Sequence, residues 1–184
     1  MRGTLGRSSL ANVVAFQLCW LGSVSGAAAG WPWVGPLIVG IWVALHVVYV
    51  APHSKSEAQF IVGTALAGWI ADSLLVTAGY LLFPPHAALG APSAIWMAAL
   101  WAGFAATIPH SLRWLDRHLG LAAGLGAIAG PLAYLGGERL GAITLSSSEA
   151  FLGVAVVYAV MTPALVATWR RLAANQPEPG VVRP

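Results

Sequence analysis

The chain has 184 residues, of which 58% are hydrophobic and only 8% are charged, and its mean hydropathy is +0.76. Such values exclude an ordinary soluble globular domain. The isoelectric point near 9.5 indicates a basic protein, but the sequence contains no aromatic-basic motif typical of nucleic-acid-binding proteins. The composition therefore predicts an all-α, polytopic membrane protein without a nucleic-acid partner.

Apolar runs that can cross a hydrocarbon core of about 30 Å as helices recur about six times along the chain. We expect a bundle of about six transmembrane helices at residues 10–29, 33–50, 58–83, 93–109, 119–136 and 149–170. The connecting segments are too short to hold another domain. Residues 1–172 are therefore predicted to form one transmembrane domain, followed by a disordered cytoplasmic tail at 173–184.

The first apolar run also resembles a secretory signal, because Arg2 and Arg7 precede it and the small residues "SGAAAG" follow it. Asn12 and Gln17 interrupt its apolar core, however, so we favour a retained transmembrane helix. The single cysteine, Cys19, lies in this run and excludes an intrachain disulfide.

The third run contains an acid, Asp72, at the centre of "GWIADSLLVTAGY". Ala65, Gly68 and Gly79 lie four or seven residues from it, which predicts a stripe of small residues where another helix can pack closely. A charged aspartate at the bilayer centre costs roughly 2.5–3.5 kcal/mol, so Asp72 must find a partner, reach water or stay protonated. It is either a structural hydrogen-bonding group or part of a ligand or proton site.

The fourth run ends at Pro109, which we expect to kink the helix just before the following residues. In the fifth run, Gly126 and Gly130 have the G-x-x-x-G spacing of close helix packing, which predicts a central helix inside the bundle. Pro131 frees the carbonyl of Ala127, and we expect that carbonyl to accept a hydrogen bond from a protonated Asp72.

The basic residues predict the orientation in the membrane. Eight of the nine Lys and Arg residues lie on the side that holds both termini, and only Arg139 lies on the other. Both termini are therefore expected to be cytoplasmic. The basic rim suits anionic headgroups, so we expect membrane phospholipids as partners, bound at His110, Arg113 and Arg117.

The depth of each polar residue in the membrane can be estimated from the rise of about 1.5 Å per helical residue, counted from the cytoplasmic end of its helix. These depths predict two layers of polar residues. The layer near the midplane contains Trp20, Asp72, Pro131 and Tyr158. The layer nearer the cytoplasm contains Asn12, His46 and Thr107.

Catalytic signatures are missing from the sequence. The five His residues have neither HxxxH nor HExxH spacing, so no metal and no cofactor is expected, although a cytoplasmic His site can still assemble through space. The chain also lacks GxSxG, Walker and dinucleotide-binding motifs. These absences argue weakly against an enzyme.

Four sequence blocks resemble, in order and spacing, the signature blocks of the DUF2878 family, a bacterial inner-membrane family without an established activity. The blocks are "NVVAFQLCW" at 12–20, "DSLLVTAGYLLF" at 72–83, "PSAIWMAALWAGFAATIPHSLRWL" at 92–115 and "GAIAGPLAYLGGERLGA" at 126–142. The resemblance covers nearly the whole chain. Pro109 departs from it, since the family pattern favours a more helix-compatible residue there.

The resemblance implies a multi-pass protein of the bacterial inner (plasma) membrane. Genes of the family are often found near those for cyclopropane-fatty-acyl-phospholipid synthase-like proteins, which implies lipid-modifying enzymes as partners. The motif positions include Gln17 and Tyr134, which we add to Asp72 and Tyr158 as a predicted intramembrane polar site.

Three functions are consistent with these features. The first is a lipid-binding or membrane-lipid-modification accessory protein, favoured by the basic rim and by the gene neighbours of the family. The second is a small proton-coupled transporter or channel with Asp72 as the relay. The third is an unrecognised membrane-embedded enzyme that uses Asp72 or His110 as an acid-base group.

Overall fold

The structure, a computed structural model, describes the backbone of residues 2–51 and 53–175, with side chains from residue 9 onward. Six α-helices make up most of the fold: α1 (Arg2–Ala28), α2 (Val34–Tyr49), α3 (Ser54–Thr77), α4 (Ile95–Ala105), α5 (Leu119–Arg139) and α6 (Ser148–Ala174). A 3-10 helix, η1 (Arg113–Arg117), and two short antiparallel strands, β1 (Leu81–Leu82) and β2 (Thr144–Leu145), complete the described elements. The all-α prediction is confirmed, while most of the predicted disordered tail, from residue 176 on, lies outside the described residues.

Four helices in the described part of the chain are long and apolar enough to cross a membrane: α1 from Ser9, α3, α5 and α6. The other two are shorter, with 16 residues in α2 and 11 in α4. Large apolar side chains such as Leu18, Val62 and Leu152 are 60% to 66% exposed on the outside of the bundle. A polytopic membrane protein is the class that fits this surface.

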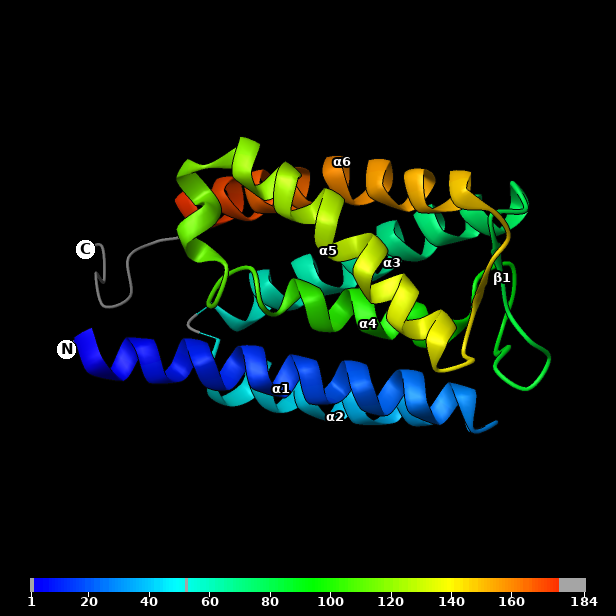
Figure 1. Ribbon diagram of the computed structural model, residues 1–184. Coiled ribbons are helices and arrows are strands. Elements are labelled where there is room, and N and C mark those ends of the chain that lie inside the picture. The colour runs from blue at the N-terminus through cyan, green and yellow to red at the C-terminus, as the bar shows by residue number, and fades with distance from the viewer. Residues whose placement is uncertain (1, 52, 176–184) are drawn as a thin grey trace.

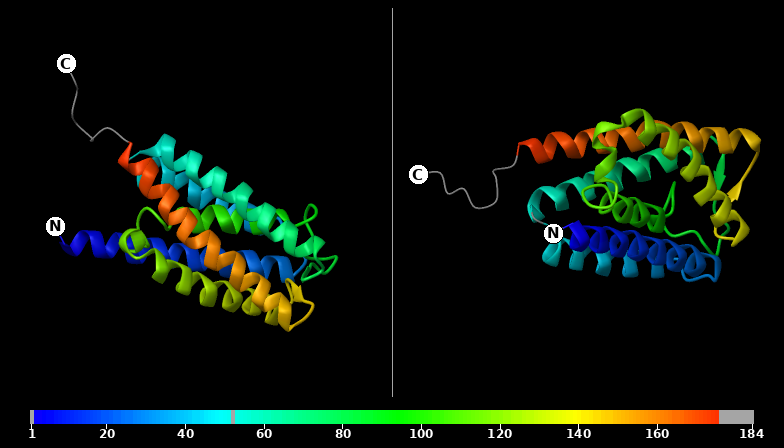
Figure 2. Two further views of the ribbon diagram at one scale, coloured as in Figure 1. Left: turned by 90° about the horizontal axis from the view of Figure 1, so that it is seen from above. Right: turned by 60° about the vertical axis from the view of Figure 1, so that its left-hand side comes forward.

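The helices run back and forth along one axis, and the start of α1 and the end of α6 lie at the same end of the molecule (Figure 1). The strand pair closes the opposite end. Helix α1 packs on α2, α5 packs on α6, and α4 contacts α1, α2 and α3. Figure 2 shows the arrangement of these helices from two further directions.

The central helix is α4, and the prediction that the fifth helix is central was wrong. Trp96 and Trp101 of α4 are 1% and 2% exposed, whereas Ile128 and Leu132 of α5 are 62% and 61% exposed. Gly126 and Gly130 of α5 pack closely on α6, because a small-residue stripe indicates which face packs closely and not how many helices surround it.

Several predicted helix ends were also wrong, including the start of α1, which begins at Arg2 rather than at residue 10, and the ends of α3 and α4 have clear local causes. Helix α3 stops at Thr77 because Gly79 adopts the left-handed conformation, with φ of +75°, and Tyr80 donates its amide hydrogen to the carbonyl of Leu75. Gly79 is therefore a helix terminator and not part of the small-residue stripe. Helix α4 ends at Ala105, four residues before Pro109, and continues as turns rather than as a kinked helix.

Candidate functional site

Asp72 lies in a closed hydrogen-bonded cluster in the core. Its side chain is 0% exposed. Trp101 donates its indole Nε1 hydrogen to Oδ2 at 2.9 Å, and Tyr134 donates its hydroxyl hydrogen to Oδ1. Both carboxyl oxygens therefore accept a hydrogen bond, and the contact with the carbonyl of Ala127 that the sequence suggested, which would require a protonated Asp72 as the donor, is not among the hydrogen bonds of the described residues. The acid faces protein, as predicted, because Gly68 leaves the space that the Trp101 ring occupies.

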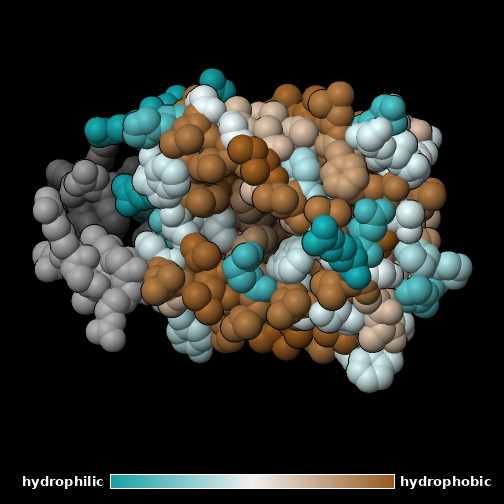
Figure 3. Space-filling model, in the orientation of Figure 1, coloured by the Kyte–Doolittle hydropathy of each residue, from teal (hydrophilic) through white to brown (hydrophobic). Residues whose placement is uncertain are grey.

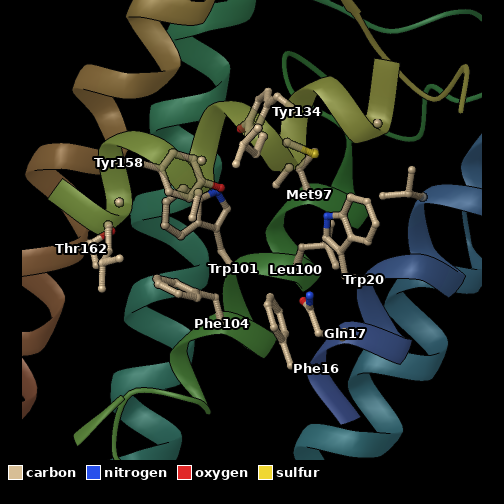
Figure 4. A pocket seen from close by; sticks show the side chains of 18 of the residues that line it. Phe16, Gln17, Trp20, Met97, Leu100, Trp101, Phe104, Tyr134, Tyr158 and Thr162 are labelled. Atoms are coloured by element: carbon tan, nitrogen blue, oxygen red, sulfur yellow. The ribbon is translucent and has the colours of Figure 1, made fainter. Parts of the chain in front are cut away.

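Tyr158 of α6 joins this cluster through its ring. The ring stacks on Trp101 with centroids 4.8 Å apart and meets the ring of Tyr134 edge-on at 5.9 Å. Three of the four predicted polar-site residues, Asp72, Tyr134 and Tyr158, therefore lie together. The fourth, Gln17, lies on α1 across an open space from them (Figure 4).

That open space is a cavity of about 560 Å³ between α1, α4, α5 and α6. Among the described residues, α1 and α5 do not pack closely on each other, and side chains such as Trp20 bridge towards α5. The lining is mostly aromatic and aliphatic, and its few polar side chains include Gln17 and Thr162. Figure 3 shows that the face above the cavity is largely hydrophobic and hollowed between α1 and α5.

Thr162, one of the residues of the cavity lining, carries a buried hydroxyl. Its side chain is 4% exposed, and its Oγ1 has no hydrogen-bond partner in the part of the chain that the structure describes. This hydroxyl faces α5 beside Gly126, and a buried hydroxyl without a partner is costly.

A second buried acid, Glu57, lies at the end of the bundle that holds both termini. His46 Nε2 lies 2.6 Å from Glu57 Oε1, and His110 Nε2 lies 3.0 Å from the same oxygen. The two imidazole rings meet edge-on with centroids 4.7 Å apart. Glu57 is 0% exposed, and its Oε2 has no hydrogen-bond partner among the described residues.

The sequence analysis did not single out Glu57, because it lies two residues after Lys55 in the connection between the predicted helices at 33–50 and 58–83. A signal was present: residues 57, 61, 64, 68 and 72 follow one another at helical steps of three or four. All five are buried on one face of α3. Extending the stripe of Asp72 towards the N-terminus would have found it.

Asn12, Thr107 and Ser111 support the non-helical backbone after α4. Asn12 donates from Nδ2 to the carbonyl of Ala106 at 3.3 Å, and Ser111 donates from Oγ to Asn12 Oδ1 at 2.5 Å. Thr107 donates from Oγ1 to the carbonyl of Phe104 at 2.6 Å. Non-helical backbone inside a membrane protein needs such hydrogen-bond partners. Asn12 and Thr107, which the sequence analysis assigned to the second polar layer, therefore have a structural role.

The predicted headgroup residues do not share one position. Arg113 and Arg117 are exposed on η1, whereas His110 is 20% exposed and directed at Glu57. Leu112 and Leu115, beside the arginines, line the cavity. In the same segment, burial raises the pKa of Asp116 above its usual value, and the positive charges of Arg113 and Arg170 offset only part of this rise.

Six apolar helices around a buried acid and an apolar cavity define a helical integral membrane protein. The profile of a family described as "Protein of unknown function (DUF2878)" matches residues 9–164, and the chain belongs to this family. The resemblance of the four signature blocks is thereby confirmed. No curated protein and no solved structure matches the chain.

Proposed function

We propose that this protein binds a membrane lipid, holds its hydrocarbon chain in the cavity between α1 and α5, and serves as an accessory to membrane-lipid modification. The cavity is the observation that carries the proposal. Its volume, about 560 Å³, falls within the roughly 300–1,000 Å³ typical of small-molecule sites, and its lining is mostly apolar.

Shape and a few polar groups set the specificity of such a site. A hydrocarbon chain gains little by moving from the bilayer to an apolar cavity, because both surroundings are apolar. Packing on the aromatic rings of Trp20, Trp101 and Phe104 supplies dispersion contacts instead.

Asp72 contributes to this function from behind the cavity wall. It fixes the side chains of Trp101 and Tyr134, and both of these line the cavity. A fully buried carboxylate with both oxygens occupied holds the wall rigid, which favours one shape of ligand over others.

In this proposal the lipid headgroup lies near η1. Leu112 and Leu115 line the cavity while Arg113 and Arg117 point outward from the same segment. Each basic residue near an anionic membrane surface contributes on the order of 1 kcal/mol. A chain in the cavity therefore extends towards a basic headgroup site.

A cavity-filling variant tests the proposal. The full-length protein is purified in mild detergent, and the lipids that remain bound are identified and quantified by mass spectrometry. We expect Ala129→Phe, in the cavity lining, to reduce bound lipid several-fold because the ring occupies the space of the chain. Ile128→Phe adds a ring to the same helix at a position that is 62% exposed, and it should retain lipid like the wild type.

Equal lipid retention in the two variants, with both folded by size-exclusion chromatography, would overturn the proposal. The headgroup is tested separately by Arg113→Ala against Arg171→Ala, because Arg171 is exposed at the same end on α6. A selective loss of phosphatidylglycerol or cardiolipin from Arg113→Ala supports the site at η1. Equal loss from both means that the charges only orient the protein.

A further inference from the structure

We propose that His46, Glu57 and His110 form a binding site for one divalent transition-metal ion such as zinc. One ligand atom from each of these residues lies within 4.8 Å of the other two. Two imidazole nitrogens and a carboxylate are a ligand set that zinc and other first-row divalent ions use in proteins. The site is distinct from the lipid cavity, whose lining contains none of the three residues.

The fold brings the ligands together from three separate segments. His46 lies in the last turn of α2 and Glu57 in the first turn of α3, and a short connection joins these two helices. His110 is presented by the turns that follow α4. This origin explains why the sequence shows no metal-ligand spacing, although it allows assembly through space.

The distances suit a site that binds its ion with small movements. Metal–ligand bonds of about 2.0–2.1 Å at tetrahedral angles place neighbouring ligand atoms roughly 3.3 Å apart. The Nε2 atoms of His46 and His110 now lie 2.6 Å and 3.0 Å from Glu57 Oε1. Side-chain shifts of less than about 1 Å convert these hydrogen bonds into a coordination sphere.

Glu57 Oε2 is the second observation that points to an ion. The glutamate is 0% exposed, yet this oxygen has no hydrogen-bond partner among the described residues. A buried carboxylate with one oxygen unused is unfavourable unless a cation or a donor meets it. A divalent ion satisfies Glu57 and, because it also binds both imidazoles, replaces the two hydrogen bonds that it displaces.

The site retains a route to solvent and a free coordination position. His46 and Glu57 are 3% and 0% exposed, but the side chain of His110 is 20% exposed at the end of the bundle. Three protein ligands leave a fourth tetrahedral position for water, as in zinc sites that bind or activate a small molecule.

The test uses the full chain in detergent, without a polyhistidine tag and after treatment with a chelator. Cobalt(II) is titrated in, because its visible absorption reports tetrahedral coordination, and zinc is added in competition. We expect one cobalt ion per chain, displacement by zinc, and a higher melting temperature in the presence of zinc.

Matched variants separate this site from adventitious binding. Glu57→Gln keeps a hydrogen-bond acceptor for the two histidines, so we expect this variant to fold. Its metal affinity should fall roughly tenfold or more, and His110→Gln should show a similar loss of affinity. His118→Gln removes an exposed histidine at the same end and should bind cobalt like the wild type. The proposal fails if the wild type binds less than one equivalent, or if folded Glu57→Gln and His118→Gln bind equally well.

Discussion

The two buried acids differ in how their oxygens are used, and this difference separates their roles. Each oxygen of Asp72 accepts one hydrogen bond, from Trp101 or from Tyr134. In Glu57, one oxygen meets both histidines and the other has no partner among the described residues. Asp72 is therefore a positioning residue within the protein, whereas Glu57 retains capacity for a ligand.

Substitutions at Asp72 test this assignment. Asn can accept from Trp101 and donate to the hydroxyl oxygen of Tyr134, so Asp72→Asn should melt within a few degrees of the wild type. Leu leaves the donors of Trp101 and Tyr134 without an acceptor. Asp72→Leu should therefore lower the free energy of unfolding by roughly 1–3 kcal/mol for each donor that is left unpaired. Thermal unfolding in detergent measures both effects. A large destabilisation by Asn would mean that the negative charge itself is required.

At the scale of the elements, α5 and α6 form the tightest helix pair through glycines. A Cβ on Gly130 would lie 2.6 Å from Cδ2 of Tyr158, and a Cβ on Gly126 would lie 2.5 Å from Oγ1 of Thr162. Both partners line the cavity, so the same contact that holds the helices together also positions the wall.

Alanine substitutions along α5 probe this packing. Gly130→Ala should lower the free energy of unfolding by about 1–3 kcal/mol, because the backbone of α5 must move away from Tyr158. Gly124 is the matched control: nothing lies within 4 Å of its added Cβ, so Gly124→Ala should be neutral or stabilise by up to about 1 kcal/mol. Similar melting temperatures for the two variants would show that α5 and α6 pack more loosely than described.

The sequence predicted the helices well because hydrophobic length is a local property. All six were placed correctly, with errors confined mainly to the ends, where Gly79 terminates α3 and α4 stops ahead of Pro109. Neighbours were predicted less well: the sequence could suggest that Asp72 faces protein, but not that Trp101 and Tyr134 meet it. The contacts of Glu57 depend on how the ends of α2, α3 and α4 meet, which no local pattern encodes.

At the scale of the molecule, short helices still fit a crossing of the membrane. Helix α2 rises only about 24 Å, but Trp31 and Trp33 are exposed at one end and Tyr49 at the other, where aromatic side chains anchor to the interfaces. Helix α4 is enclosed by protein, and the buried turns after it have internal hydrogen bonds, so its length need not match the bilayer.

The orientation of the whole bundle follows from its ends. The start of α3, η1 and the end of α6 lie at the end of the bundle that holds the start of α1, whereas the end of α5 lies at the other (Figure 1). The first three elements carry Lys55, Arg113, Arg117, Arg170 and Arg171, and the end of α5 carries Arg139. The positive-inside rule therefore predicts that the basic end is cytoplasmic. Reporter fusions after Trp33, Lys55, Leu89, Arg117 and Ser147 should alternate, beginning with a periplasmic signal, because each fusion follows one more crossing.

Two outcomes would contradict this topology. A cytoplasmic signal after Leu89 would mean that α3 does not cross the membrane, and a periplasmic signal after Arg117 would mean that α4 and its turns re-enter on the same side. The second result would also conflict with the position of His110 beside His46 and Glu57, at the end of the bundle reported by the fusion after Lys55.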